Sequence, residues 1–272
     1  MISYIGGKSR MAKWICEYIP QDIETYVEVF GGAFWVYVKG DIHTRPNLSK
    51  VVYNDKNKFM ANLFKCFTNP DEFMPYLKQY KSQDPYLFGQ FQKRLKQMVV
   101  EEVHFPLGTY TTAAKYAYCA TQVFSGSKIM ESKFIDLKGN YGSKYDAMCN
   151  RLQKPSVIEK LRNITDVENL DYTDLINKYD SSKTFFYVDP PYWKTENYYS
   201  NHDFDSYDHN RLCSQLKTIK GQFALSYYDF EQLSEWLPKD KYNWQMKQFS
   251  KAAGAQKGKK QNKGTELLIM NY

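Results

Sequence analysis

The sequence lacks the features that mark membrane-spanning and secreted proteins. Its 272 residues contain no run of about 18 apolar residues, so no transmembrane helix is expected. The first residues, MISYIGGKSRMAKW, hold no long apolar stretch of the kind that a secretory signal needs. We therefore expect a cytoplasmic protein without a membrane partner.

The sequence also offers few ligands for a metal ion. Its five cysteines are odd in number, widely scattered and without a Cys-X-X-Cys pair, and its four histidines stand at no metal-ligand spacing to them. Scattered thiols without a pairing pattern are typical of reduced intracellular proteins. We expect no disulfide framework and no metal site.

Apolar and aromatic residues are plentiful, at 43% and 17% of the chain. This composition excludes wholesale disorder, which needs low hydrophobicity and high charge. Positive charge is concentrated in residues 239–264, which hold eight lysines and one acid, Asp240, a formal +7 that equals the net charge of the whole chain. Such a segment suits a polyanionic partner, and a solvated loop is the alternative that charge alone leaves open.

Short apolar runs predict seven strands, at 26–30, 50–53, 167–170, 184–188, 222–226, 242–249 and 266–270. Helical spacing predicts helices over 11–19 and 59–67, and a further helix before the fifth strand. Strands that alternate with helices and read as continuous apolar runs indicate a parallel α/β sheet. The Lys/Gly/Gln-rich stretch 251–264 joins the last two strands and predicts an antiparallel hairpin at one edge.

Residues from about 70 to 157 differ from the rest, being polar, rich in Tyr and Lys and helical in pattern. We therefore expect one doubly wound domain, formed by residues 1–57 and 158–272, that is split by a helical insertion at 58–157. No internal repeat is evident.

Ligands of open α/β sheets bind beyond the carboxyl ends of the strands. The first predicted strand is followed by Gly31-Gly32, which lets the backbone pass close to a ligand. The second is followed by Asp55, which suits either a ribose diol or a helix N-cap, and both alternatives stay open. The third is followed by Asp171 and Tyr172.

The fourth strand is followed by Asp189-Pro190-Pro191-Tyr192-Trp193, the most specific motif in the chain. Two prolines fix the backbone, direct carbonyls outward and hold the aspartate in place. Such a turn can accept hydrogen bonds from an exocyclic amine and stack its ring on a tyrosine.

The segment Phe186 to Tyr192, FYVDPPY, resembles the catalytic motif of S-adenosylmethionine-dependent DNA amino-methyltransferases. The order of the other motifs is similar to the Dam-type DNA adenine methyltransferase family: YIGGK at 4–8, YVEVFGG at 26–32, Asn54-Asp55, a stretch over 116–128, and TELLIMN at 265–271. The resemblance implies a Rossmann-like methyltransferase sheet with a helical inserted target-recognition domain. Two departures stand out: Ala33-Phe34-Trp35 replaces small residues of the family pattern, and Ser125 replaces its usual Asn.

The resemblance implies methyl transfer from S-adenosylmethionine to the exocyclic N6 of adenine in double-stranded DNA. The target atom is not reachable inside a duplex, so the base must be flipped out. Asp189 and the Pro190 carbonyl would hold the amine, and Tyr192 would stack on the flipped base. The residues expected to bind the cofactor are Tyr4, Lys8, Phe30, Gly31, Gly32, Asp55, Asp171, Tyr172 and Asp189. Phe34 either crowds the methionine end of the cofactor or points into the core.

The insertion and the basic segment are expected to contact DNA. The candidate residues are Lys93, Arg94, Lys115, Ser125, Lys128, Lys133, Lys138, Lys257, Lys259 and Lys260, although solvated helix faces explain most of the lysines equally well. Changing the lysines of 251–263 to Gln should weaken DNA binding at all sequences and flatten its salt dependence.

Two other classes of function remain open at this stage. One is a methyltransferase acting on another amine, such as cytosine N4, RNA or a protein glutamine; Asp189 favours adenine over these. The other is a non-catalytic DNA-binding protein that keeps the methylase fold, an alternative that rests on Phe34. We expect a restriction-modification or phage-type enzyme of a bacterial or phage-infected cell, a monomer or a weak dimer on DNA.

Overall fold

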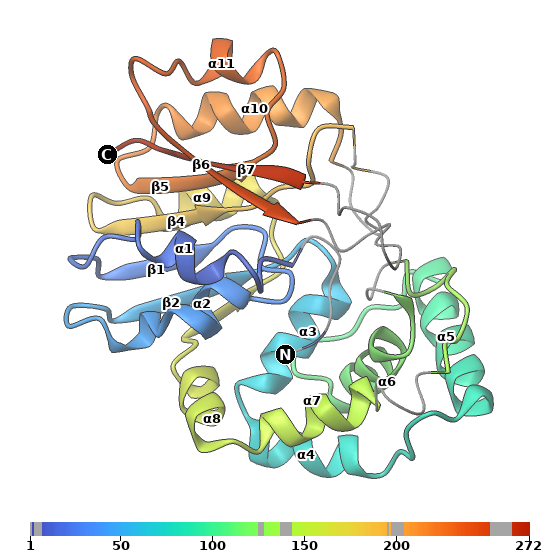
Figure 1. The fold of residues 1–272 in the computed structure, drawn as a ribbon. Coiled ribbons are helices and arrows are strands. Elements are labelled where there is room, and N and C mark those ends of the chain that lie inside the picture. Colours follow the sequence, from blue (N-terminus) through green and yellow to red (C-terminus); the bar gives the residue numbers. More distant parts are fainter. Residues whose placement is uncertain are drawn as a thin grey trace.

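The computed structural model describes residue 2 and residues 7–124, 128–136, 143–194, 196, 204–250 and 263–272. A seven-stranded sheet forms its centre, and most of the helices between the second and third strands gather to one side (Figure 1). The strands are β1 (Thr25–Glu28), β2 (Lys50–Asn54), β3 (Asp166–Glu168), β4 (Thr184–Val188), β5 (Gln222–Tyr227), β6 (Asn243–Ser250) and β7 (Lys263–Met270). Each predicted strand is present.

The strand order is β3-β2-β1-β4-β5-β7-β6. The first five strands in this order are parallel to one another, whereas β7 runs antiparallel to both of its neighbours, β5 and β6. This confirms the predicted mostly parallel Rossmann-like sheet and its antiparallel hairpin. The order also places β1 beside β4, so the switch point of the sheet lies between the strands that precede Gly31 and Asp189.

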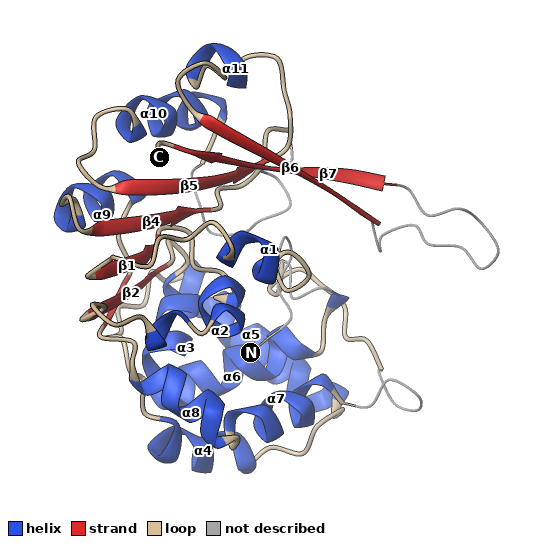
Figure 2. Cartoon of the chain, turned by 60° about the vertical axis from the view of Figure 1, so that its left-hand side comes forward, coloured by secondary structure: helices blue, strands red, loops and turns tan. Residues whose placement is uncertain are grey.

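Helices cover both faces of the sheet. They are α1 (Ala12–Cys16), α2 (Trp35–Gly40), the short 3₁₀ helix η1 (Ile42–Thr44), α3 (Lys58–Phe67), α4 (Pro70–Lys78), α5 (Pro85–Val100), α6 (Tyr110–Thr121), α7 (Lys144–Leu152), α8 (Pro155–Arg162), α9 (Tyr172–Tyr179), α10 (Ser206–Leu216) and α11 (Leu233–Trp236). Figure 2 shows α9 and α10 on one face of the sheet and α1 and α2 on the other.

Strand β4 shows why the sheet needs cover on both faces. Its five residues are all buried, and their side chains alternate between two hydrophobic cores. Phe185 and Tyr187 belong to the core that holds α1, α2 and α3, whereas Phe186 and Val188 pack with α9 and α10. A strand buried on both faces reads as a continuous apolar run, which is why the sequence predicts it well.

The first helix is shorter than the predicted 11–19. Helix α1 ends at Cys16, and the N–H groups of Glu17, Tyr18 and Ile19 bond to carbonyls three residues earlier. This tightening of the last turn brings the chain out of the helix before Pro20.

Between β2 and β3, the described residues contain helices but no strand. Helices α4 to α7 gather beside the sheet, and α3 packs both against α6 and against the ends of β2 and β3 (Figure 1). Because α3 contacts both the sheet and the helices of the insertion, the predicted domain limits at 58 and 157 stay a prediction. None of the helices in the described ranges is long and apolar enough to cross a membrane.

Candidate active site

The glycine loop after β1 lies tightly against the end of β2. The Gly31 N–H donates to the Asn54 carbonyl at 2.6 Å, and a Cβ at Gly31 would come within 2.4 Å of the Tyr53 ring. Gly32 has a φ of 46°, and its N–H donates to the Asp55 carboxylate at 3.0 Å. Only glycine fits the first position, and the second has the left-handed backbone that glycine adopts without strain.

The Asp55 carboxylate organises this edge of the sheet. Besides Gly32 it accepts the Asn57 N–H at 2.8 Å, and its side chain is largely buried. Burial raises the pKa of Asp55 to about 6, although the bonds from Asn57, Gly32 and Tyr53 oppose the shift. The N-cap of α3 is Asn57, so the N-cap alternative for Asp55 is wrong. Binding of a ribose diol by Asp55 stays a prediction.

Phe34 points into the core. It is 1% exposed, and its ring lies 4.7 Å from that of Tyr37 and 5.1 Å from that of Tyr53, measured between centroids. The residue caps α2 with a left-handed backbone, φ 56°, which turns the ring inward. Of the two alternatives for this residue, the structure has the second.

Glu28, at the end of β1, is a buried carboxylate that the sequence does not mark as a site residue. Its carboxylate accepts the Tyr37 N–H in the first turn of α2 at 2.9 Å and the Tyr26 hydroxyl at 2.7 Å. The Phe34 side chain makes no capping bond, so Glu28 satisfies an N–H that the N-cap usually serves. Burial raises the pKa of Glu28 to about 8, despite these two bonds.

Across the switch point, Asp189 forms an ion pair with Lys8. The Lys8 ammonium lies 2.7 Å from the Asp189 carboxylate, and both side chains are mostly buried. Burial raises the pKa of Asp189, and the charge of Lys8 only partly offsets this. The structure therefore brings together two predicted site residues that stand far apart in the sequence.

Tyr192 is held in the same cluster. Its ring lies under the Lys8 ammonium, 4.7 Å from the centroid, and its hydroxyl donates to Glu266 on β7 at 2.5 Å. Pro190 is buried beside Asp189. Stacking of Tyr192 on a flipped base stays a prediction. Trp193 stacks on Phe230 at 5.1 Å, and both rings are partly buried against the core on this face of the sheet, which favours a core role over a pocket role.

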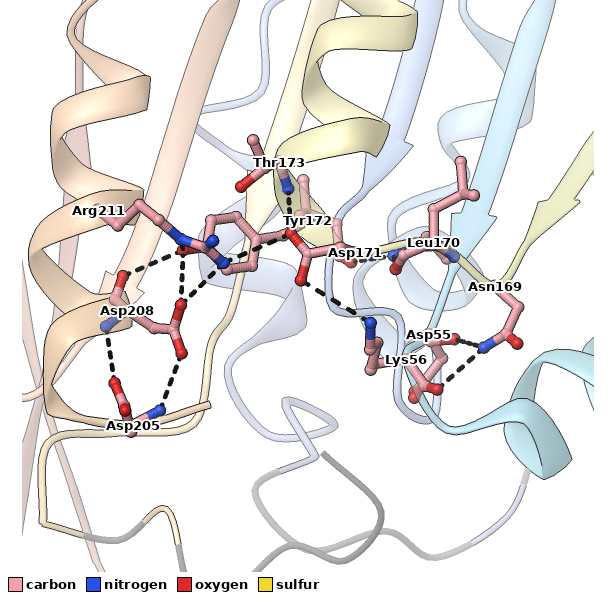
Figure 3. A network of polar contacts seen from close by, with 12 residues as sticks. Asp55, Lys56, Asn169, Leu170, Asp171, Tyr172, Thr173, Asp205, Asp208 and Arg211 are labelled. Carbon is pink, nitrogen blue, oxygen red and sulfur yellow. Dashed lines mark hydrogen bonds and ion pairs between the residues drawn. The ribbon is translucent and has the colours of Figure 1, made fainter. Parts of the chain in front are cut away.

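Asp171 and Tyr172 lie in a polar network that joins the ends of β2 and β3 to α10 (Figure 3). Asp171 caps α9 by accepting the Thr173 N–H and pairs with Arg211 at 3.5 Å. The Tyr172 hydroxyl accepts a hydrogen bond from Arg211 and donates to Asp208. The exposed edge of this network is charged, and the predicted contact of Asp171 and Tyr172 with the cofactor adenine stays a prediction.

Phe30 and Asn54 complete the strand ends. The Phe30 ring is half-buried, 5.7 Å from the rings of Tyr172 and of Phe204. The Asn54 side chain donates to the carbonyls of Val29 and Leu170, so one amide links the ends of β1, β2 and β3. These bonds therefore hold in place, relative to one another, the three strand ends that carry most of the predicted cofactor-binding residues.

The predicted DNA contacts are spread over the insertion. Lys93 and Arg94 are exposed on α5, Lys133 is exposed in a loop, and Lys115 and Lys128 are half-buried. Six predicted residues, Tyr4, Ser125, Lys138, Lys257, Lys259 and Lys260, lie outside the described residues. Within the described ranges, no group of three or more His, Cys, Asp and Glu is arranged to hold a metal ion.

Comparison with known proteins decides the family. A profile of the D12 class N6 adenine-specific DNA methyltransferases matches residues 4–250. The chain belongs to this family. The family implies S-adenosylmethionine as the methyl donor and DNA as the class of substrate.

Individual relatives are more distant. The chain is 26% identical to modification methylase LlaI of Lactococcus lactis subsp. lactis over 226 residues, which cover 80% of the chain and 34% of that protein. It is 22% identical to modification methylase StsI of Streptococcus sanguinis over 230 residues, 74% of the chain and 29% of that protein. This member of the family thus matches about a third of the length of each relative.

Two further similarities are narrower in what they show. Over 31 residues, 11% of the chain and 9% of the relative, the identity to type II methyltransferase M2.HphI of Haemophilus parahaemolyticus is 48%. A solved rRNA methyltransferase, aviRa of Streptomyces viridochromogenes, matches with a TM-score of 0.36 and 10% identity, covering 96% of this chain and 83% of that one. The fold assignment rests on the strand order of this chain itself.

Proposed function

We propose that this family member transfers a methyl group from S-adenosylmethionine to the exocyclic N6 of a flipped adenine in duplex DNA, at a specific sequence. The observation that carries the proposal is the position of Asp189 at the switch point. It stands at the end of β4, across from the glycine loop at the end of β1, with its carboxylate buried against Lys8. Ligands of such sheets bind at this point.

The groups at the strand ends fit the cofactor that the family implies. Its ribose hydroxyls are donors, and Asp55 offers a carboxylate at the end of β2. Gly31 and Gly32 form a loop without side chains between Asp55 and Asp189. When bound, S-adenosylmethionine supplies an electrophilic methyl group, which leaves its sulfur with the C–S electron pair remaining on sulfur.

The amine of adenine is a poor nucleophile because its lone pair is delocalised into the ring. Asp189 and the Pro190 carbonyl each accept one N–H and so hold the nitrogen in the geometry for attack. As the N–C bond forms, positive charge develops on the nitrogen, and the Asp189 carboxylate stabilises it more than it stabilises the ground state. The surplus proton on the nitrogen then leaves to solvent.

Phe34 no longer favours a non-catalytic protein. Its ring is in the core among Tyr37 and Tyr53, so the departure from the family pattern at this position does not fill the site. Target recognition by the helical insertion is proposed with the domain limits given above, and exposed Lys93 and Arg94 on α5 are the phosphate contacts that it offers.

The test is transfer of tritiated methyl from S-adenosylmethionine to unmethylated DNA, followed by nucleoside analysis. Wild type should yield labelled 6-methyladenine, and Asp189→Asn should yield none while still binding DNA. Label in 4-methylcytosine would redirect the proposal to another base. Absence of label on every DNA offered to a folded, cofactor-binding wild type would refute it.

A further inference from the structure

Glu266 is a buried carboxylate that directly precedes the apolar half of its strand. It lies on β7, is 2% exposed, and is followed by Leu267, Leu268 and Ile269, which are buried as well. A carboxylate in such surroundings is unfavourable unless it has charged or hydrogen-bonding partners. The identity of its partners therefore points to its role.

Those partners are the residues at the proposed methyl-transfer site. Glu266 accepts the Tyr192 hydroxyl at 2.5 Å and lies 3.5 Å from the Lys8 ammonium. The same ammonium is 2.7 Å from Asp189. One cation thus lies between two carboxylates and is closer to Asp189.

Other charged and titratable groups around Glu266 are few among the described residues. Tyr187 on β4 and Tyr228 after β5 are close enough to feel its charge. Lys247 is its cross-strand partner on β6, and the Lys247 ammonium lies 5.6 Å from the centroid of the Trp14 ring. Burial raises the pKa of Glu266, and Lys8 opposes the rise.

The position of Lys8 creates a conflict for the proposed reaction. The substrate amine needs the Asp189 carboxylate, which Lys8 occupies in this structure. A second cation at Asp189 would also oppose the positive charge that develops on the amine. A carboxylate that can take Lys8 away from Asp189 resolves both problems.

We propose that Glu266 is this second partner: it is a positioning residue that draws Lys8 from Asp189 when the amine binds and keeps Tyr192 in place meanwhile. The inference rests on the proposed function. Glu266 touches no reacting atom in it and acts through Lys8 and Tyr192. The antiparallel strand β7 thereby contributes to a site that is otherwise built from the ends of parallel strands.

The test compares wild type with Glu266→Gln, which keeps the shape and an acceptor for Tyr192 but removes the charge. We expect kcat to fall at least tenfold and its pH profile to shift, with the KM for DNA changed less than threefold. Glu266→Asp should recover part of kcat. Glu168→Gln is the matched control, because Glu168 also accepts a tyrosine hydroxyl and a lysine, Tyr179 and Lys178, away from this cluster.

A second readout does not depend on turnover. Competitive labelling of lysine amines, followed by mass spectrometry, reports how strongly Lys8 is held in its charged form. Glu266→Gln should make Lys8 at least threefold more reactive at pH 8, and Glu168→Gln should not. Unchanged reactivity of Lys8 together with kcat within twofold of wild type would overturn the inference. An inactive wild type whose Lys8 still responds to Glu266→Gln would contradict the proposed function and leave the Glu266–Lys8 coupling established.

Discussion

Replacing Phe34 by glycine sets two effects of known sign against each other. Phe34 has a left-handed backbone, φ 56°, which costs an L-residue about 1–2 kcal/mol and glycine almost nothing. Its ring is 1% exposed in the core, and removing a buried Phe side chain costs about 3–5 kcal/mol. The packing loss is the larger, so Phe34→Gly should lower the free energy of unfolding by about 2 kcal/mol.

The measurement is thermal unfolding together with calorimetric binding of S-adenosylmethionine. For a chain of this size the midpoint should fall by about 4 °C or more. Phe34→Ala is the matched control: it loses the ring but keeps the backbone cost, and should be about 1 kcal/mol less stable than Phe34→Gly. Cofactor affinity should stay within threefold of wild type. A Phe34→Gly protein as stable as wild type would refute the packing argument. A Phe34→Gly protein that binds the cofactor much more tightly than wild type would place the ring over the cofactor.

Three further predictions concern the glycine loop, a buried carboxylate and the DNA contacts. Gly31→Ala would place a Cβ 2.4 Å from the Tyr53 ring and should lower the unfolding free energy by about 1–3 kcal/mol. Gly89→Ala is its control, because a Cβ there would meet no atom within 4 Å and should stabilise helix α5 slightly. Equal midpoints for the two variants in thermal unfolding would contradict this. The pKa of Glu28 is raised to about 8 in the folded protein, so its protonation stabilises the fold at low pH and this contribution is lost as pH rises through 8. Glu28→Gln should therefore flatten the fall of the thermal midpoint between pH 5 and 8, and an unchanged slope would show that Glu28 is ionised throughout. Changing Lys93 and Arg94 together to Gln should reduce the slope of log Kd against log salt by about 2, measured by DNA-binding titrations; the same slope would exclude both as phosphate contacts.

The strands and the elements that follow them could be predicted because their signals are local. A strand buried on both faces, such as β4, leaves an apolar run in the sequence, and the motif after it starts where that run ends. The parallel order then brings Gly31, Asp55 and Asp189 to the same edge without further information.

The partners of buried polar side chains could not be predicted in the same way. Glu266 matches a family motif, but its contact with Lys8 depends on β7 lying between β5 and β6, which no local pattern encodes. The Phe34 ring could be placed only from its left-handed backbone, a conformation that local rules disfavour for phenylalanine. For Glu28, an acid at the end of a strand gives no sign that it caps a helix elsewhere.

The insertion of β7 between β5 and β6 has a consequence for how the site is assembled during synthesis. Strands β2 to β5 can each pair with an earlier strand as they leave the ribosome, but β6 has no neighbour in the sheet until β7 arrives. Because Glu266 comes with β7, Lys8 has Asp189 as a partner before it has Glu266. The Lys8–Glu266 contact therefore forms only once β7 has been made, so a chain stalled before residue 263 would carry Lys8 and Asp189 without their third partner.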